Sequence, residues 1–173
     1  MELILNEAHY ETLIREIIPA ARKFVWIATA DLKDLHVAGP GGKFRPFLGE
    51  LADLVENGVD VRLIHAKEPG PRFREDFDRF PVLIESDQFE RVLCPRMHAK
   101  IVIVDGVVAY VGSANLTGAG IGAKSSNRRN FEAGILTRDP EMVAELMEYL
   151  DALWIGDHCE GCGRRDVCPD PIV

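Results

Sequence analysis

The sequence has no apolar run that approaches the roughly 18–20 residues needed to span a bilayer. Residues 1–7 lack the basic start and the apolar stretch of a signal peptide, so we expect a cytoplasmic protein without stable membrane association. Basic residues are also scarce: 20 Lys and Arg stand against 28 Asp and Glu, and the formal net charge is -8. Phosphate contacts draw their affinity from basic groups, so any surface of this acidic chain that binds nucleic acid must be a local cluster of basic residues.

What is present indicates one globular domain. The 173 residues lie well below the length of about 250–300 at which cores usually divide. Hydrophobic residues make up 47% and charged residues 28%, which excludes disorder as the main state. Residue patterns predict helices over 7–23, 47–56 and 139–154, and strands over 24–29, 59–64, 82–84, 91–93, 99–104, 107–111 and 131–137. They predict loops over 39–42, 69–80 and 118–130, with a short helix within 69–80 as an alternative. The alternation of helices and strands implies a parallel sheet with helices on its faces.

A β-hairpin is predicted in the middle of the chain. Asp105-Gly106 is a strong signal for a two-residue turn between the strands at 99–104 and 107–111. In that register Val104 pairs with Val107. The side chain of Asp105 then points away from the face that carries His98 and Lys100, so we interpret it as a turn former or as a partner of the groups that touch the substrate.

Four polar side chains gather on one face of this predicted hairpin. His98 pairs with Ser113, and the two-residue period of a strand places Lys100 and Asn115 on the same face, near the end away from the turn. An imidazole attacks phosphorus or moves a proton near neutral pH, and an amine, a hydroxyl and an amide bind the phosphoryl oxygens. The pattern predicts a phosphate-transfer site rather than a strand with a polar start. A register slip of one residue would turn alternate side chains to the other face.

These residues carry a family resemblance. The pattern His98-x-Lys100-x4-Asp105-x6-Gly112-Ser113-x-Asn115 matches the HKD motif of the phospholipase D superfamily at every position. The segments 24–28, 51–63 and 130–136 also resemble the family domain, so the resemblance covers nearly the whole chain except the cysteine tail. It implies an α/β fold, with a mixed β-sheet sandwiched between helices, over residues 1–156. Residues 157–173 would form a small cysteine-rich metal knuckle packed on that domain.

The resemblance also implies a homodimer. The active site of the family uses two HKD motifs, and this chain has one full copy. A second His-x-Lys at 65–67 is followed by Arg72 where the motif needs Asp, and we interpret it as the end of a strand. Single-motif members pair symmetrically, so two copies of His98 would meet across a two-fold axis.

The resemblance assigns roles to individual residues. One His98 would attack phosphorus to form a phosphohistidine, and the other would protonate the leaving oxygen. Lys100 and Asn115 would bind the phosphoryl oxygens. Glu132 matches the acidic residue that fixes the histidine tautomer, although a solvent-exposed strand residue is the alternative interpretation. No catalytic divalent metal is implied.

The cysteines suggest a structural metal centre. Cys159-x2-Cys162-x5-Cys168 is compact, and Cys94 lies four residues before His98. Four thiolates suit tetrahedral Zn2+ or a 4Fe-4S cluster, with His158 as a possible substitute ligand for zinc. The grouping resembles the iron staple of RecB-like nucleases, which have a different fold. Four reduced free cysteines are the alternative interpretation.

We weigh three functions. The first is a metal-independent phosphodiesterase, specifically a nuclease that binds its substrate with Lys124, Arg128 and Arg129 of a basic loop. A local positive rim could also include Lys43, Arg45, Arg72 and Arg74. The second is a phospholipid hydrolase, for which the sequence offers no lipid anchor and no strongly basic amphipathic helix. The third is a non-catalytic protein that binds nucleic acid or another protein, and the intact motif argues against it.

Overall fold

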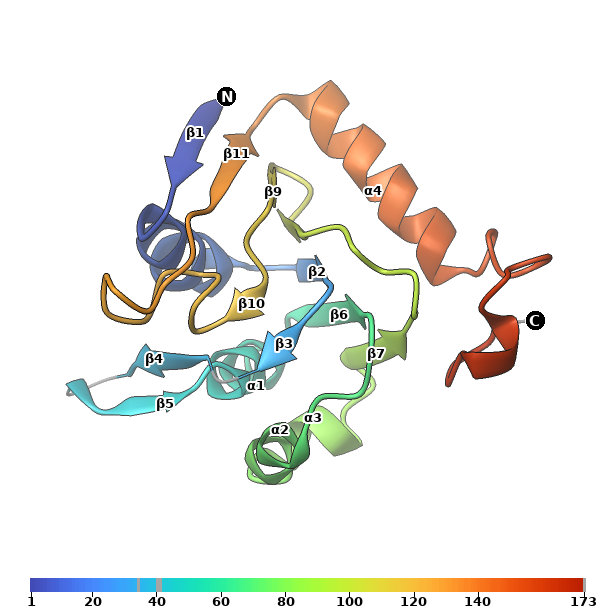
Figure 1. Ribbon diagram of the computed structural model, residues 1–173, viewed down its shortest axis with the longest axis horizontal. Helices are drawn as coiled ribbons and strands as arrows, with labels where there is room; N and C mark the ends of the chain where they lie inside the picture. The colour runs from blue at the N-terminus through green and yellow to red at the C-terminus, as the bar shows by residue number, and fades with distance from the viewer. Residues whose placement is uncertain (34, 40–41, 173) are drawn as a thin grey trace.

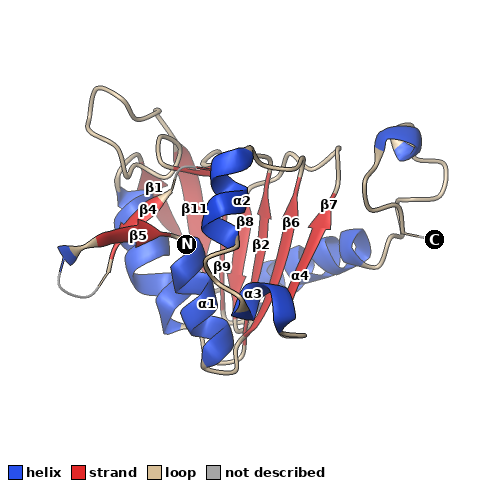
Figure 2. Cartoon of the chain, turned by 90° about the horizontal axis from the view of Figure 1, so that it is seen from below, coloured by secondary structure: helices blue, strands red, loops and turns tan. Residues whose placement is uncertain are grey.

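A computed structural model describes residues 1–33, 35–39 and 42–172. Its centre is a seven-stranded mixed sheet with helices on both faces, as the family resemblance implied (Figures 1 and 2). Along the sheet the order is β1 (Glu2–Leu5), β11 (Ala133–Thr137), β9 (Val108–Gly112), β8 (Ile101–Val104), β2 (Phe24–Thr29), β6 (Asp60–His65) and β7 (Phe89–Leu93). Strands β2, β6 and β7 run parallel, and the other pairs are antiparallel. The parallel sheet predicted from the alternation is therefore only the β2–β6–β7 part.

The remaining elements surround this sheet. They are a π-helix (Tyr10–Ile17) continued by a 3-10 turn (Ile18–Ala20), α1 (Leu48–Glu56), α2 (Pro71–Phe77), α3 (Val82–Glu85), α4 (Pro140–Trp154), a 3-10 turn (Arg165–Val167), and the short strands β3 (Leu32–Lys33), β4 (His36–Ala38), β5 (Phe44–Pro46) and β10 (Leu116–Thr117). No helix in the described ranges is long and apolar enough to cross a bilayer. The predicted loop at 39–42 lies partly outside the described residues.

Two local predictions were wrong. Residues 82–84 form helix α3 rather than a strand, because Pro81 holds the helical φ of -53° at the N-cap and Leu83 is buried in the core. The N-terminal strand β1 was not predicted at all. It pairs with β11 and has only four residues, so the short apolar run at residues 3–5 did not indicate a strand by itself.

Each face of the sheet has its own core. On one face the N-terminal helix and α1, α2 and α3 pack against the sheet through residues such as Leu13, Leu51 and Phe77. On the other face α4 packs through Val143 and Leu150 (Figure 2). Helix α4 begins as the sequence predicted, with Asp139 accepting hydrogen bonds from the backbone of Glu141 and Met142.

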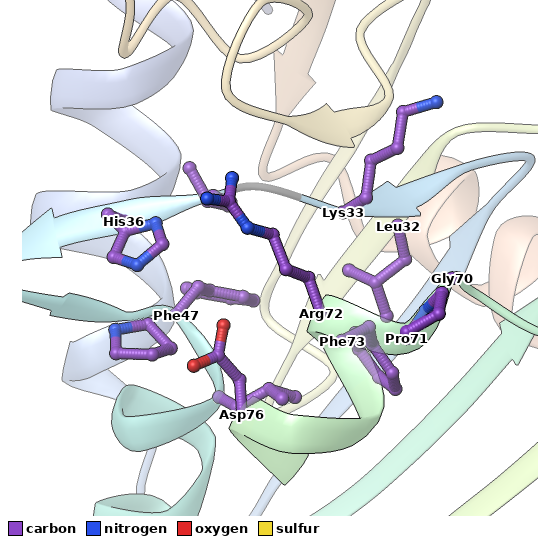
Figure 3. A pocket seen from close by; sticks show the side chains of 12 residues that line it. Leu32, Lys33, His36, Phe47, Gly70, Pro71, Arg72, Phe73 and Asp76 are labelled. Atoms are coloured by element: carbon purple, nitrogen blue, oxygen red, sulfur yellow. The ribbon is translucent and has the colours of Figure 1, made fainter.

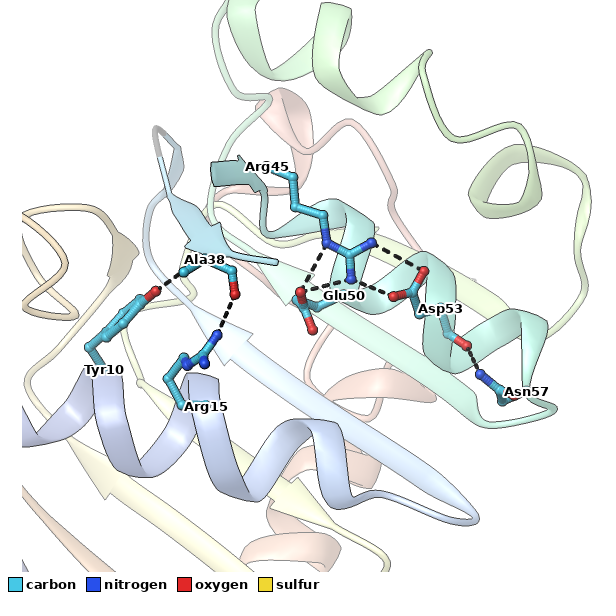
Figure 4. Close-up of polar contacts among 7 residues, drawn as sticks. All are labelled: Tyr10, Arg15, Ala38, Arg45, Glu50, Asp53 and Asn57. Atoms are coloured by element: carbon cyan, nitrogen blue, oxygen red, sulfur yellow. Dashed lines mark hydrogen bonds and ion pairs between the residues drawn. The ribbon is translucent and has the colours of Figure 1, made fainter. Parts of the chain in front are cut away.

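An arginine clamp fixes the β4–β5 hairpin to α1 (Figure 4). The Arg45 guanidinium donates to Glu50 Oε1 at 2.8 and 3.0 Å and also pairs with Asp53. On the other side the Tyr10 hydroxyl accepts a hydrogen bond of 3.2 Å from Ala38 N. Arg45 is therefore occupied within the fold, which argues against the predicted use of this residue in a positive rim.

The side chain of a tyrosine packs over two facing glycines near the end of β9. Gly112 of β9 pairs with Gly134 of β11, and the side chain of Tyr110, only 1% exposed, fills the space over both. A Cβ added at Gly134 would lie 2.3 Å from Tyr110 Cε2, and one at Gly112 would lie 2.2 Å from Tyr110 Oη. His9 packs edge-on against the same ring, with centroids 5.4 Å apart. The motif glycine is thus required by packing.

We predict that Gly134→Ala lowers the free energy of unfolding by about 1–3 kcal/mol, because the buried Tyr110 ring must move to admit the methyl group. Urea unfolding followed by circular dichroism measures the change. Gly163→Ala is the matched control, since no atom lies within 4 Å of its added Cβ. Equal stabilities of the two variants would contradict the packing argument.

Candidate active site

The predicted site residues lie along one edge of the sheet. This edge is formed by the ends of β2, β6 and β7 and by the start of β8, at the upper side of Figure 2. His98 and Lys100 lie in the extended segment that leads into β8, and Ser113 and Asn115 follow the end of β9. Glu132 directly precedes β11. The chain therefore brings all five to the same edge.

The hairpin register differs from the predicted one. Val104 pairs with Val108, not with Val107, so the turn contains three residues and the register is shifted by one. By this pairing the Gly112 backbone, rather than Val111, lies opposite Lys100 and donates a 3.1 Å hydrogen bond to its carbonyl. Ser113 still reaches the site because it lies after the end of β9, where strand alternation no longer applies.

Asp105 explains the longer turn. Its backbone has φ of 54°, and the following Gly106 has φ of 67°. The carboxylate accepts hydrogen bonds from the backbone of Arg22 at 2.9 Å, Lys23 at 2.7 Å and Phe24 at 3.0 Å. Burial raises the pKa of Asp105, but these three donors together hold the pKa below its usual value. In this structure Asp105 fastens the start of β2, at the end of the hairpin away from His98.

Asn115 fastens the other end of β2. Its Oδ1 accepts hydrogen bonds from Ala30 N and Asp31 N, each at 3.2 Å, and from Thr29 Oγ1 at 3.3 Å. Because the amide oxygen is fully used in this way, the Asn115 Nδ2 group is the part of the side chain left to donate to a ligand. No motif in the sequence identified Thr29 as a neighbour of the site. Its hydroxyl oxygen also accepts a hydrogen bond of 3.2 Å from Leu116 N.

His98 and Lys100 form a close pair. The Lys100 amine donates to the His98 carbonyl at 2.7 Å and lies 3.4 Å from His98 Nδ1. Lys100 is 7% exposed, whereas the imidazole of His98 is open to solvent. Burial lowers the pKa of Lys100, and the nearby charge of Glu132 partly offsets this effect. The arrangement presents an accessible imidazole over a fixed positive charge.

Glu132 bonds to neighbours other than the histidine. Its carboxylate accepts from the Ser113 hydroxyl and, at 3.1 Å, from Asn130 Nδ2, while Ser113 Oγ also accepts from Ala133 N at 3.1 Å. Asn6 accepts a hydrogen bond of 3.1 Å from Glu132 N and thereby links β1 to the site. The role of Glu132 in fixing the tautomer of His98 therefore stays a prediction.

The three proposed substrate-binding cations lie in different surroundings. Lys124 and Arg128 are exposed on the loop at 118–130, whose base is closed by a 3.1 Å hydrogen bond from Asn130 N to Ala119 O. Arg129 instead pairs with Glu7 at 3.4 Å and is half-buried.

The second His-x-Lys is a strand end, as predicted. His65 is the last residue of β6, is 1% exposed, and has its Nδ1 2.9 Å from the Lys67 carbonyl. Burial, together with the charge of Arg91, lowers the pKa of His65 to about 4, so the ring is neutral at neutral pH.

A pocket of about 410 Å³ adjoins this edge (Figure 3). It begins at Leu32 and Lys33, directly after the residues that bind Asn115, and its wall includes Phe47 and Phe73. Figure 3 shows the Arg72 side chain extending between those of His36 and Lys33. The pocket therefore combines an apolar wall with a polar mouth that includes Arg72, His36 and the carboxylate of Asp76. Arg74, also expected in the positive rim, instead pairs with Glu68 at 2.9 Å.

The cysteines lie after the end of β7 and in the tail that follows α4. Cys94, Cys159, Cys162 and Cys168 are free thiols and are half-buried. Within the described ranges, no group of three or more His, Cys, Asp or Glu side chains is positioned to hold a metal ion. The predicted knuckle is therefore not shown as a metal site.

Comparisons with known proteins identify relatives of this chain. Residues 14–154 match the family model described as "Cardiolipin synthase, PLD-like domain". The protein named cardiolipin synthase 2 from Bacillus cereus is 29% identical over 141 residues, which cover 76% of this chain and 23% of that protein. The chain thus spans only 23–25% of the length of the curated relatives it matches.

Two solved structures share the fold. Nuc from Salmonella typhimurium, described as a phospholipase D family member, superimposes with a TM-score of 0.63 at 16% identity, covering 88% of this chain and 92% of that one. NucT from Helicobacter pylori gives a TM-score of 0.61 at 18% identity, covering 86% and 92%. At these identities the likeness shows a common fold.

We predict that Asp105→Asn lowers the free energy of unfolding by about 1–3 kcal/mol at neutral pH, because backbone donors lose their ionised acceptor. The pKa of Asp105 is lower in the folded chain, so its contribution is present above about pH 4 and is lost as the pH falls through the folded pKa. Urea unfolding of both proteins from pH 7 down to about pH 3 should show the difference shrinking. A difference that stays constant with pH would contradict this role.

Proposed function

The chain belongs to the phospholipase D superfamily, and we propose that it is a phosphodiesterase that cleaves nucleic acid through His98. The observation that carries the proposal is the arrangement at the sheet edge, where the open imidazole of His98 lies over the buried amine of Lys100, 3.4 Å away. Ser113, Asn115 and Glu132 reach the same edge. A nucleophile beside a fixed positive charge suits phosphoryl transfer.

The proposed reaction uses His98 from two copies of the chain. Nε2 of one His98 attacks phosphorus, and the bond from phosphorus to the leaving oxygen breaks. The second His98 gives its proton to that oxygen. Water then attacks the phosphohistidine, the second imidazole takes the proton of the water, and the bond between phosphorus and the first His98 breaks.

The two histidines need different protonation. Attack through Nε2 requires a proton on Nδ1, whereas the donor needs its proton on Nε2. In this structure Nδ1 faces the Lys100 amine, and a lysine ammonium can only donate, so the contact favours the form protonated on Nε2. In the proposed reaction the attacking His98 exchanges this contact for the Glu132 carboxylate, which can accept a hydrogen bond from Nδ1.

Two neighbouring side chains are suited to bind the phosphoryl oxygens. The amine of Lys100 is held by the His98 carbonyl at 2.7 Å, so its charge has a fixed position. The Nδ2 group of Asn115 can donate to a phosphoryl oxygen because its amide oxygen is bonded to the end of β2. In a symmetric pair these groups would surround the phosphorus from both copies.

Basic side chains on both sides of the motif support a nucleic-acid substrate. Lys124 and Arg128 are exposed on the loop that leads to Glu132. On the other side His36 and Arg72 are exposed at the mouth of the 410 Å³ pocket. A polynucleotide presents successive phosphates and can contact both groups at once, which compensates locally for the net charge of -8.

The apolar wall of the same pocket favours a second candidate. Leu32, Leu35, Phe47 and Phe73 could receive an acyl chain while Arg72 holds a head-group phosphate. The similarity to the protein named cardiolipin synthase 2 supports this phospholipid alternative. Because the motif chemistry is the same for both substrates, the choice depends on the flanking surface.

We predict that the purified chain cleaves DNA or RNA in EDTA and that His98→Ala lowers the rate at least about a hundredfold, because nucleophile and acid are lost together. Gel assays with labelled oligonucleotides and plasmid measure the rate. His158→Gln is the matched control, since that histidine is exposed and lies in the tail.

The same preparations assayed on phosphatidylglycerol or cardiolipin vesicles distinguish the candidates. Hydrolysis of vesicles without cleavage of nucleic acid would replace the first candidate by the second. Binding of nucleic acid without cleavage of either substrate would indicate a non-catalytic protein.

We predict a homodimer of twice 19.3 kDa in light scattering, with one shared site. The wild type and His98→Ala are mixed in equal amounts and refolded, so that the chains pair at random. Only dimers with His98 in both chains would react, so about a quarter of the wild-type activity remains at equal total protein. Independent sites would leave about half. Mixing the wild type with His158→Gln in the same way controls for the treatment and should leave the activity unchanged.

A further inference from the structure

All four cysteines of the chain line one cavity of about 240 Å³. Cys94 enters it from the segment after β7, and Cys159, Cys162 and Cys168 enter from the tail that follows α4. The cavity shares no lining residue with the 410 Å³ pocket, and three of its cysteines belong to the tail drawn at the right of Figure 1. Neither the phosphodiesterase chemistry nor the substrate surface uses these residues.

The tail repeats one kind of turn, and each turn involves a cysteine. Cys162 N donates to Cys159 O at 3.3 Å, Arg165 N donates to Cys162 O at 3.1 Å, and Cys168 N donates to Arg165 O at 3.2 Å. Gly161, between the first two cysteines, has φ of 69°, which favours glycine. This spacing places three thiols on one side of a short segment.

The tail has no apolar core of its own. Not one of the residues described over 155–172 is buried. Polar contacts link it to the domain, such as the 2.7 Å hydrogen bond from Leu93 N to Asp170 and the 3.8 Å contact of Arg96 with Cys162 Sγ. Short segments without a core usually need disulfides or a metal to fold, and these thiols are free. A thiolate-bound group would supply the missing folding energy.

The cavity is larger than a single ion requires. Zinc binds each sulfur at about 2.3 Å, so four thiolates around it lie within about 4 Å of one another. In the described part of the chain no three of these side chains are positioned around a single ion, and the space that the four cysteines line measures about 240 Å³. Arg96 and Arg164 line this space and would offset the negative charge of a thiolate-bound cluster, and Met97 and Leu153 add apolar lining.

We propose that Cys94, Cys159, Cys162 and Cys168 bind a 4Fe-4S cluster that fastens the tail to the segment leading into His98. The centre is structural, because its four ligands are not among the groups proposed to bind or cleave the substrate and it joins the tail to the segment after β7. It is independent of whether the substrate is nucleic acid or lipid.

Metal analysis of the full chain tests the proposal without any activity assay. The chain is purified anaerobically, and a portion is reconstituted with ferrous iron and sulfide. We expect a brown protein with visible absorption and about four iron and four sulfide ions per chain. Zinc without iron in the purified chain, or no uptake of iron and sulfide on reconstitution, would overturn the proposal.

Single variants test the ligand set. Cys162→Ser should lose most of the iron and the visible absorption. Glu160→Gln, at an exposed position between two of the ligands, should retain both and is the matched control. His158→Asn should also retain the iron. Full iron content in Cys162→Ser, or loss of iron in His158→Asn, would overturn the assignment to four cysteines, and circular dichroism shows whether each variant is folded.

Discussion

The central strand β2 is held at both ends by side chains of the catalytic motif. At its start the Asp105 carboxylate accepts backbone hydrogen bonds from Arg22, Lys23 and Phe24. At its end Asn115 accepts from Ala30 and Asp31. The antiparallel pairing of β8 with β2 makes both contacts possible, because the turn after β8 lies beside the start of β2. The motif therefore builds the middle of the sheet while it positions the site, and the placement of His98 depends on that double attachment.

Local residue patterns predicted most elements of the fold but not the register of the hairpin. The segments 24–29 and 140–154 could be read directly, since apolar runs and a proline-containing helix start are local signals. The turn at Asp105-Gly106 was expected to contain two residues and contains three. The hydrogen bonds that stabilise it come from residues 22–24, far away in the sequence, and turn propensities carry no information about such partners.

The motif spacing predicted which side chains reach the site edge, but not what they contact. Glu132 was expected to orient His98, yet its carboxylate is bonded to Ser113 and Asn130. Arg129 was expected to bind substrate and pairs with Glu7. Ion pairs and amide contacts depend on the three-dimensional approach of distant segments. The requirement for glycine at position 112 also depends on distant segments, because an added side chain there would collide with the Tyr110 ring and with Gly134 of the facing strand.

The contact between the tail and β7 has a consequence for self-association. Strand β7 ends the sheet on one side, and such a strand presents backbone groups that another molecule can pair with. Asp170 and Cys168 occupy the N–H and the carbonyl of Leu93 at the end of this strand. Proteolytic removal of the tail would uncover these groups, and truncated molecules would be prone to aggregate edge to edge.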